Sequence, residues 1–134
     1  DSGGAGKFRG GLGQFITIGA YEGYEFDVSL MFDRVHNPPL GRKGGLPGGA
    51  TIVIKDDGSK MRGKGIQFVE EGRVIEMSLP GGAGYGPPKD RLRALVLRDV
   101  ILGYVSIKNA KEHFDLTMSE IIEIETAIQT GITI

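Results

Sequence analysis

The segment Leu79–Pro88 reads LPGGAGYGPP, so its ten residues include four Gly and three Pro. It lies between a strand-like alternating segment and a segment with helical spacing. Gly loses more conformational freedom on folding than any other residue, so ordering this segment has a high entropic cost. Two explanations are open: either the segment is only a packed turn, or it brings bare backbone up to something that a side chain would block.

Alternation of apolar and polar residues predicts strands before this segment. The predicted strands are Gln14–Ile18, Tyr24–Phe32, Thr51–Lys55 and Arg73–Leu79. Ala20–Gly23 is predicted to form a hairpin turn between the first two strands, and Asp56–Gly58 a turn after the third. The loop His36–Ala50 holds three Pro and five Gly. Loops of this length in compact domains are usually functional or disordered.

The period changes after Pro88, where Asp90–Leu102 places its apolar residues at helical spacing. Gly103 is a natural stop for this helix. Ser106 is predicted to cap a second short helix that ends at Phe114, with Ala110 facing inward.

The C-terminal residues fit two structures. Strict alternation in Ile122–Ile134 favours a strand, although Glu120–Gln129 also fits a helix. The element order predicts an α+β fold that is β-rich, with strands first and then two short helices near the C-terminus. We expect residues 1–134 to form a single domain.

Composition excludes several classes of function. The net charge is -1, with 16 Lys and Arg against 17 Asp and Glu, which gives no reason to expect nucleic acid or a membrane as partner. The chain has no Cys, so disulfides, thiolate zinc sites and a cysteine nucleophile are excluded. No apolar run approaches a membrane span and nothing argues for export, so we expect a cytoplasmic protein.

The loop Gly3–Gly13, GGAGKFRGGLG, combines glycines with two cations, Lys7 and Arg9. Backbone amides in such a loop form anion-binding nests, and the two cations would add charge. The loop lacks the spacing of a Walker motif. The alternative is a mobile terminus.

Other polar residues form no complete catalytic or metal-binding set. His36 and His113 show no metal-ligand spacing and are interpreted as surface residues. Asp33-Arg34 is predicted to be an ion pair that holds the long loop. Glu70-Glu71 would point to opposite faces of a strand and so form no catalytic dyad. A basic patch, Lys60–Lys64, follows the third strand.

Four segments in order resemble the C-terminal region of the hydantoinase B / oxoprolinase family. They are GKFRGGLGQ (Gly6–Gln14), PPLGRKGGLPG (Pro38–Gly48) after Asp33-Arg34, LPGGAGYGPPKDR (Leu79–Arg91) and VLRDVILGYVS (Val96–Ser106). The resemblance covers about residues 3–114 and departs from the family at Ala83 and Pro87. Four motifs in order are more specific than any one glycine-rich loop.

The resemblance implies the B-type subunit of an ATP-dependent enzyme that opens cyclic amides such as hydantoin, N-methylhydantoin or 5-oxoproline. Related assemblies carboxylate ketones such as acetone and acetophenone. The implied partners are the N-terminal part of the B-type subunit and an A-type ATP-binding subunit, and a second copy of the chain is a further candidate. ATP and a divalent metal are expected in the complete complex and neither in this chain.

Family members are several hundred residues long. This chain is therefore expected to be a fragment, a separately encoded piece or half of a split subunit, and to be inactive alone. A noncatalytic β-rich interaction module is the alternative from a different class, and it predicts a monomer with a polar surface. The fragment hypothesis predicts an exposed apolar face.

We expect Arg9 to contact an anionic intermediate, with glycine amides as neutral donors. The candidate residues for anion or substrate binding are Lys7, Arg9, Gly10, Gly11, Gly81, Gly82 and Gly84. The sequence identifies no catalytic residue and no metal ligand.

Overall fold

The computed structural model describes residues 1–130 as five strands followed by three α-helices, which confirms the predicted α+β class. The strands are β1 (Phe15–Gly19), β2 (Phe26–Met31), β3 (Ile52–Lys55), β4 (Lys64–Val69) and β5 (Val74–Ser78). They form two antiparallel sheets, one in the order β1-β5-β3 and one of β2 and β4.

The predicted hairpin between the first two strands is wrong. A turn is present, since the Tyr24 amide donates to the Tyr21 carbonyl at 3.1 Å. However, β1 pairs with β5 and β2 pairs with β4, so the turn passes from one sheet to the other. The physical reason is burial, because this pairing places Val69 and Ile75 between the sheets with no exposed surface.

Strand β4 was not predicted from the sequence. It exposes large apolar residues to solvent, so the segment lacks the usual alternation of buried apolar and exposed polar residues. Ile66 and Phe68 point outward and are exposed, whereas Val69 points inward. The buried members of the sheet core are Leu30, Val53, Val69, Ile75 and Met77.

The helices form the other end of the chain, with a short 3-10 turn, η1 (Pro88–Asp90), before α1 (Arg93–Ile101). Gly103 adopts a φ of 71° just after α1, as its stop role requires. Helix α2 (Ile107–Phe114) begins with the predicted cap, because the Ser106 hydroxyl accepts the Asn109 amide at 3.1 Å. Ala110 and Phe114 are buried as predicted.

The predicted C-terminal strand is wrong over the described residues, because Met118–Thr130 is a helix, α3. Residues 131–134 of the predicted strand lie outside the described part of the chain. A capping box explains the start of α3: the Thr117 amide donates to Glu120 Oε2 at 2.9 Å, and the Glu120 amide donates back to Thr117 Oγ1 at 3.5 Å. Helical spacing then buries Ile121 and Ile124.

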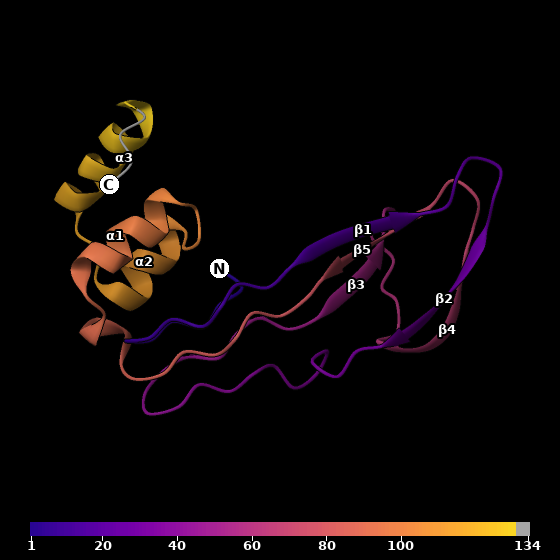
Figure 1. Ribbon diagram of the computed structural model, residues 1–134, viewed down its shortest axis with the longest axis horizontal. Coiled ribbons are helices and arrows are strands. Elements are labelled where there is room, and N and C mark those ends of the chain that lie inside the picture. The colour runs from indigo at the N-terminus through magenta and orange to yellow at the C-terminus, as the bar shows by residue number, and fades with distance from the viewer. Residues whose placement is uncertain (131–134) are drawn as a thin grey trace.

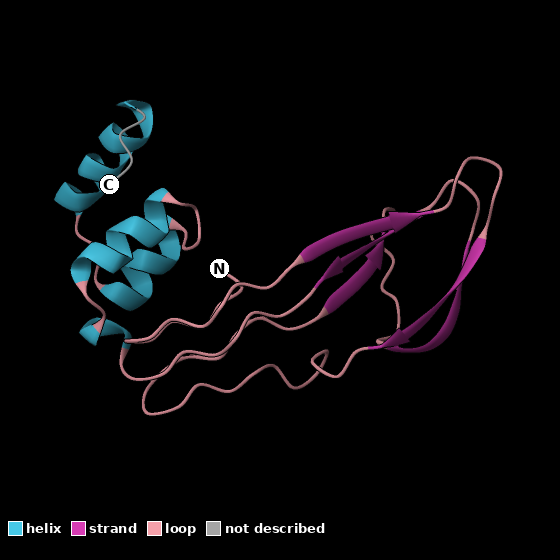
Figure 2. Ribbon diagram, viewed as in Figure 1, coloured by secondary structure: helices cyan, strands magenta, loops and turns pink. Residues whose placement is uncertain are grey.

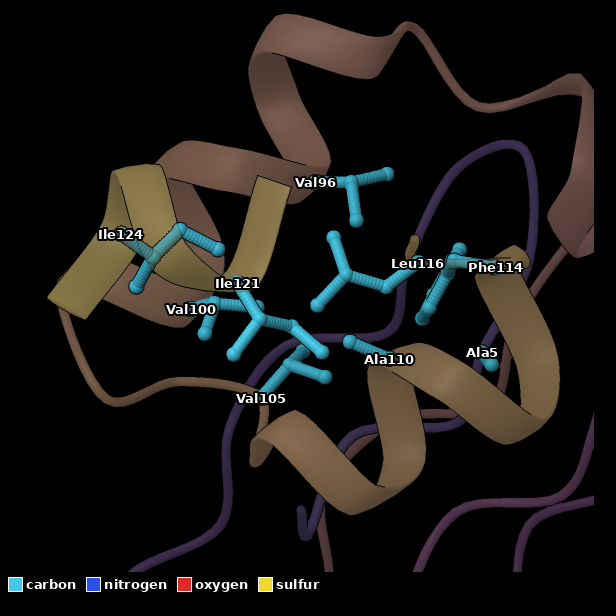
Figure 3. Packing of buried hydrophobic residues seen from close by; sticks show 9 residues of the cluster. All are labelled: Ala5, Val96, Val100, Val105, Ala110, Phe114, Leu116, Ile121 and Ile124. Atoms are coloured by element: carbon cyan, nitrogen blue, oxygen red, sulfur yellow. The ribbon is translucent and has the colours of Figure 1, made fainter. Parts of the chain in front are cut away.

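The helices and the strands lie at opposite ends of the molecule, joined by extended segments that run side by side (Figure 1). Those segments form neither helix nor strand along most of their length (Figure 2). Ala5, from the N-terminal segment, packs into the helical core beside Phe114 (Figure 3). None of the helices in residues 1–130 has the length and apolar character needed to cross a bilayer.

Candidate functional site

Three glycine-rich segments, residues 3–13, 41–49 and 79–86, pack together as a unit that we call the glycine bundle. Phe8 and Tyr85 exchange two backbone hydrogen bonds of 3.0 Å, which join the first and third segments. The Leu46 amide donates to the Ala5 carbonyl at 2.7 Å, and the Gly84 amide donates to the Leu46 carbonyl at 2.9 Å. All three segments are therefore bonded to one another, and the N-terminal loop is not a mobile terminus.

Several positions of the bundle require glycine because the backbone of a neighbouring segment lies too close to leave room for a side chain. A Cβ atom added at Gly10 would lie 2.0 Å from the Gly82 carbonyl oxygen, and one at Gly84 would lie 2.0 Å from the Ala5 oxygen. A Cβ at Gly45 would lie 2.2 Å from the Gly84 oxygen. Real Cβ atoms essentially never approach closer than 3.0 Å. The bare backbone of residues 79–88 is therefore brought up against other bare backbone of the same chain.

Packing of the bundle also occupies several of the amides predicted to bind an anion. The Gly10 amide donates to the Gly4 carbonyl at 3.0 Å, and the Gly82 amide donates to Gly11 at 2.9 Å. The Gly84 amide is bonded to Leu46, as described above. Gly81 lies against Ser2, whose carbonyl oxygen is 2.3 Å from an added Cβ. The anion-binding role of these glycines stays a prediction.

A buried charge cluster lies where the bundle meets the helices. We call Arg9, Arg91 and Asp99 the Asp99 cluster. Arg9 Nε donates to Asp99 Oδ2 at 3.0 Å, and Arg91 Nη2 donates to the same oxygen at 2.7 Å. The Asp99 side chain is only 1% exposed. The Arg9 guanidinium also lies 5.6 Å from the centre of the Tyr104 ring, within cation–π range.

The Asp99 cluster connects three distant parts of the sequence. Arg9 comes from the first glycine segment, Arg91 follows η1, and Asp99 belongs to α1. A second bond from Arg91, Nη1 to the Lys7 carbonyl at 3.2 Å, adds to this link. Removing one partner of a buried ion pair leaves an uncompensated charge and costs roughly 3–5 kcal/mol. The cluster therefore fixes the glycine bundle against the helices.

The two predicted cations have different environments. Lys7 is exposed, with its ammonium 5.8 Å from the centre of the Phe8 ring. Arg9 is half-buried, and besides Asp99 it donates from Nη1 to the Gly10 carbonyl at 2.7 Å. Its role at an anion stays a prediction.

Sequence reasoning missed Asp99 and Arg91 as members of this cluster. The available signal was that both lie in the segments that carry the family resemblance, PPKDR and VLRDVILGYVS. No local pattern, however, pairs a residue near position 9 with one near position 99.

A small cavity of about 70 Å³ adjoins Arg9 between the first glycine segment and α2. Asn109 and His113 line it from the helix. Ligand pockets typically measure roughly 300–1,000 Å³, so this cavity is too small to be a complete substrate site.

Residues that commonly bind metals are spread over the part of the chain that the structure describes. Within residues 1–130, no three His, Asp or Glu side chains lie close enough together to hold a metal ion. His36 is exposed on its loop, and His113 is half-buried in the last turn of α2. The divalent metal that the resemblance implies for the complete complex, outside this chain, stays a prediction.

The α+β fold is shared with a much larger solved chain. The nucleotide-free structure of acetone carboxylase matches 97% of this chain and 24% of its own chain, with a TM-score of 0.63 and 18% identity. At that identity the likeness shows the fold alone. The sequence profile of hydantoinase B/oxoprolinase matches residues 1–88, which contain all three glycine segments. The chain belongs to the hydantoinase B/oxoprolinase family.

Relatives of known sequence are also much longer than this chain. An uncharacterized protein of Methanocaldococcus jannaschii is 40% identical over 114 residues, which cover 82% of this chain and 20% of that protein. An uncharacterized protein of Schizosaccharomyces pombe is 32% identical over 143 residues, which cover 93% of this chain and 10% of that protein. The caprolactamase beta subunit of Pseudomonas jessenii is 29% identical over 132 residues, which cover 88% of this chain and 22% of that subunit. The chain thus spans between 10% and 22% of the length of these relatives.

Proposed function

We propose that this chain is the C-terminal part of the B-type subunit of an ATP-dependent enzyme that opens a cyclic amide. One observation carries the proposal: the family match over residues 1–88 contains the same three glycine segments that interlock in the structure. The similarity to a caprolactamase subunit supports a cyclic amide as substrate, because a lactam is one. Hydantoin, N-methylhydantoin and 5-oxoproline are the other candidates.

The chain's own contribution is a rigid frame. The glycine bundle and the Asp99 cluster hold Arg9 at the junction of the loops and the helices. ATP belongs to an A-type subunit and the divalent metal to the rest of the B-type subunit, so the isolated chain is expected to be inactive. The chain acts as one domain of that larger subunit.

The second candidate is part of a ketone carboxylase subunit. The favouring observation is the fold shared with acetone carboxylase. The identity there is 18%, against 29% for the caprolactamase subunit, so we favour ring opening. A noncatalytic interaction module is the third candidate.

The test is substrate-dependent ATP hydrolysis by the complete complex, with the whole B-type subunit and its A-type partner. Hydantoin, 5-oxoproline and caprolactam are compared with acetone plus bicarbonate. ATP hydrolysis stimulated by a cyclic amide, with release of the ring-opened acid, supports the proposal. Stimulation by ketone and bicarbonate alone would assign the carboxylase, and stimulation by none would favour the interaction module.

The role of Arg9 is tested in the same complex with Arg9→Lys. Lysine keeps the charge but cannot keep both the bond to Asp99 and the bond to the Gly10 carbonyl, so some stability should be lost. We expect turnover to fall by more than the loss of folded protein explains, because lysine also lacks the two-pronged contact with an oxyanion. Lys108→Arg, on the exposed side of α2, is the control. Unchanged kinetics would reject the role. Loss of turnover only in proportion to loss of folded protein would assign Arg9 to the fold.

We infer that the rest of the B-type subunit docks on the outer face of β2 and β4. Met31, Ile66 and Phe68 are 77%, 67% and 48% exposed. Met31 pairs with Lys64, and side chains two residues apart on a strand lie on the same face. Ile66 and Phe68 follow Lys64 at this spacing, so Met31, Ile66 and Phe68 share one face of the sheet. A neighbouring group of exposed apolar side chains marks an interaction surface. The chain covers at most 22% of any of the three relatives, so at least 78% of each relative lies outside the matched part. The corresponding part of the B-type subunit is the partner that would cover this face.

A further inference from the structure

A large cavity lies at the strand end, away from the Asp99 cluster. Its volume is about 820 Å³, within the roughly 300–1,000 Å³ of small-molecule pockets. Three segments line it: residues 32–37 after β2, residues 50–53 at the start of β3, and residues 60–64 before and at the start of β4. We call it the ring cavity.

Backbone hydrogen bonds join the three lining segments into a closed ring. The Phe32 amide donates to the Gly63 carbonyl at 2.8 Å. The Thr51 amide donates to the Arg34 carbonyl at 2.9 Å, and the Met61 amide donates to the Val53 carbonyl at 3.0 Å. A wall held in this way is already formed before a ligand arrives, which lowers the entropic cost of binding.

The lining is positively charged. Lys60, Arg62 and Lys64 all line the cavity, and Asp33 is the one carboxylate among its lining residues. Asp33 Oδ1 accepts from Lys64 Nζ at 2.6 Å. This bond holds the pKa of Asp33 below its ordinary value, so the carboxylate is ionised and offsets Lys64.

This ion pair also corrects a sequence prediction. Asp33 pairs with Lys64 across the β2–β4 sheet and not with its neighbour Arg34, which donates to the Asn37 carbonyl at 3.5 Å. Adjacent residues at the end of a strand point to different sides, which separates the two side chains.

Lys60 and Arg62 are left with positive charge that no carboxylate neutralises. In residues 1–130, neither forms an ion pair with a carboxylate; Arg62 donates from Nη2 to the Ile66 carbonyl at 3.2 Å. The chain as a whole carries a net charge of -1, so the positive charge of this lining is not a property of the whole chain. Val35, Val53 and Met61 provide apolar lining beside these two cations.

We propose that the ring cavity binds a small organic carboxylate, with its apolar part against Val35, Val53 and Met61 and its carboxylate at Lys60 and Arg62. Guanidinium and ammonium groups recognise a carboxylate through charge-assisted hydrogen bonds. An apolar body adds contact area that a bare inorganic anion lacks. The inference is independent of the proposed ring-opening function.

The test is a titration of the isotopically labelled 134-residue chain, followed by the amide chemical shifts in nuclear magnetic resonance spectra. The probes are hexanoate, acetate and inorganic phosphate. We expect hexanoate to bind saturably, at least about tenfold tighter than acetate or phosphate, and to shift amides of residues 32–37, 50–53 and 60–64. A double variant, Lys60→Gln with Arg62→Gln, should weaken hexanoate binding by about tenfold or more.

The matched control is Lys108→Gln with Lys111→Gln, two exposed lysines of α2, which should leave hexanoate binding unchanged. If the first double variant loses its fold, Lys60→Gln alone replaces it. Equal, weak binding of all three probes, or shifts confined to other residues, would overturn the proposal. So would binding to this chain but not to the complete B-type subunit, because polypeptide would then fill the cavity.

Discussion

Neighbouring glycines of the bundle differ greatly in what an added methyl group would meet. A Cβ at Gly10 would lie 2.0 Å from the Gly82 carbonyl oxygen, whereas a Cβ at Gly11 meets no atom within 4 Å. At Gly82 the nearest atom is 3.3 Å away, so a small adjustment would suffice there. The need for glycine is therefore set residue by residue by backbone contact.

Gly10→Ala should destabilise the chain by on the order of 3 kcal/mol, because the carbonyl that blocks the methyl group belongs to backbone that cannot rotate away. Its matched control is Gly11→Ala, which should change the free energy of unfolding by less than about 0.5 kcal/mol. Urea unfolding followed by circular dichroism measures both. Similar losses for the two variants would show that glycine flexibility matters here and close approach does not.

The Asp99 cluster gives a second prediction. Asp99→Asn keeps the shape of the side chain but leaves Arg9 and Arg91 without their shared anion. We expect a loss of about 3 kcal/mol in the free energy of unfolding. Asp90→Asn, an exposed carboxylate of η1, is the control and should change it by less than about 0.5 kcal/mol. A loss below about 1 kcal/mol for Asp99→Asn would mean that the two arginines find other partners or water.

At the scale of elements, local patterns predicted the structures that depend on local contacts. Alternation located β5 because Ile75 and Met77 face the core, and the Ser106 cap located α2. A turn was also predicted, at Ala20–Gly23, and one is present at Tyr21–Tyr24. The two strands that it joins were predicted to pair with each other, and they do not. Strand partners lie far apart in the sequence, and no pattern within β1 indicates that β5 lies beside it.

The C-terminal helix was misread for a related reason. Ile122 and Ile124 alternate as in a strand, but Ile121 and Ile124 also lie on one face of a helix. The deciding signal was the Thr117…Glu120 spacing of a capping box, which indicates a helix start. At the candidate site, the sequence indicated Arg9 but could not indicate Asp99, its partner 90 positions away.

The junction of α1 and α3 leads to a pH prediction. Arg93, the first residue of α1, forms an ion pair with Glu120 and also donates to the Phe114 carbonyl at 2.7 Å. The hydrogen bond from Arg93, with further bonds from Thr117, lowers the pKa of Glu120 from 4.5 to about 2. A lowered pKa in the folded state contributes stability that is present above the unfolded value and is lost as the pH falls through the folded value.

The thermal midpoint should therefore fall as the pH is lowered from 4.5 to about 2. Other paired carboxylates add to the fall, so the informative quantity is the difference between the unchanged chain and Glu120→Gln. We expect the variant to be less stable by about 1 kcal/mol at neutral pH, since the pair is partly exposed. The difference should shrink across this pH window. A constant difference at all pH values would show that the charge of Glu120 is irrelevant.

On the scale of the whole molecule, the two hydrophobic cores are connected through backbone packing. Ala5 and Leu46 of the glycine bundle pack on the helical core, and Met77 of the sheet core comes two residues before the third glycine segment. The bundle thus joins the two ends (Figure 1). Such a frame fixes distant surfaces relative to one another, which is what the docking proposed above requires.

The last prediction concerns that fit. The double change Ile66→Lys with Phe68→Lys places charges on the outer face of β2 and β4, where both side chains are already exposed, so the thermal midpoint should barely change. Capture of the chain by the separately produced remainder of the B-type subunit should weaken by at least about tenfold, because two apolar contacts on this face are replaced by charges that docking would desolvate. Tyr21→Lys, at a side chain that is 90% exposed on the loop between β1 and β2, is the control and should leave capture unchanged. The dissociation constants are measured with the chain immobilised on a surface.

Unchanged capture by the double variant would show that the remainder docks elsewhere. Self-association of the unchanged chain in sedimentation experiments, abolished by the same double change, would instead show that a second copy covers this face.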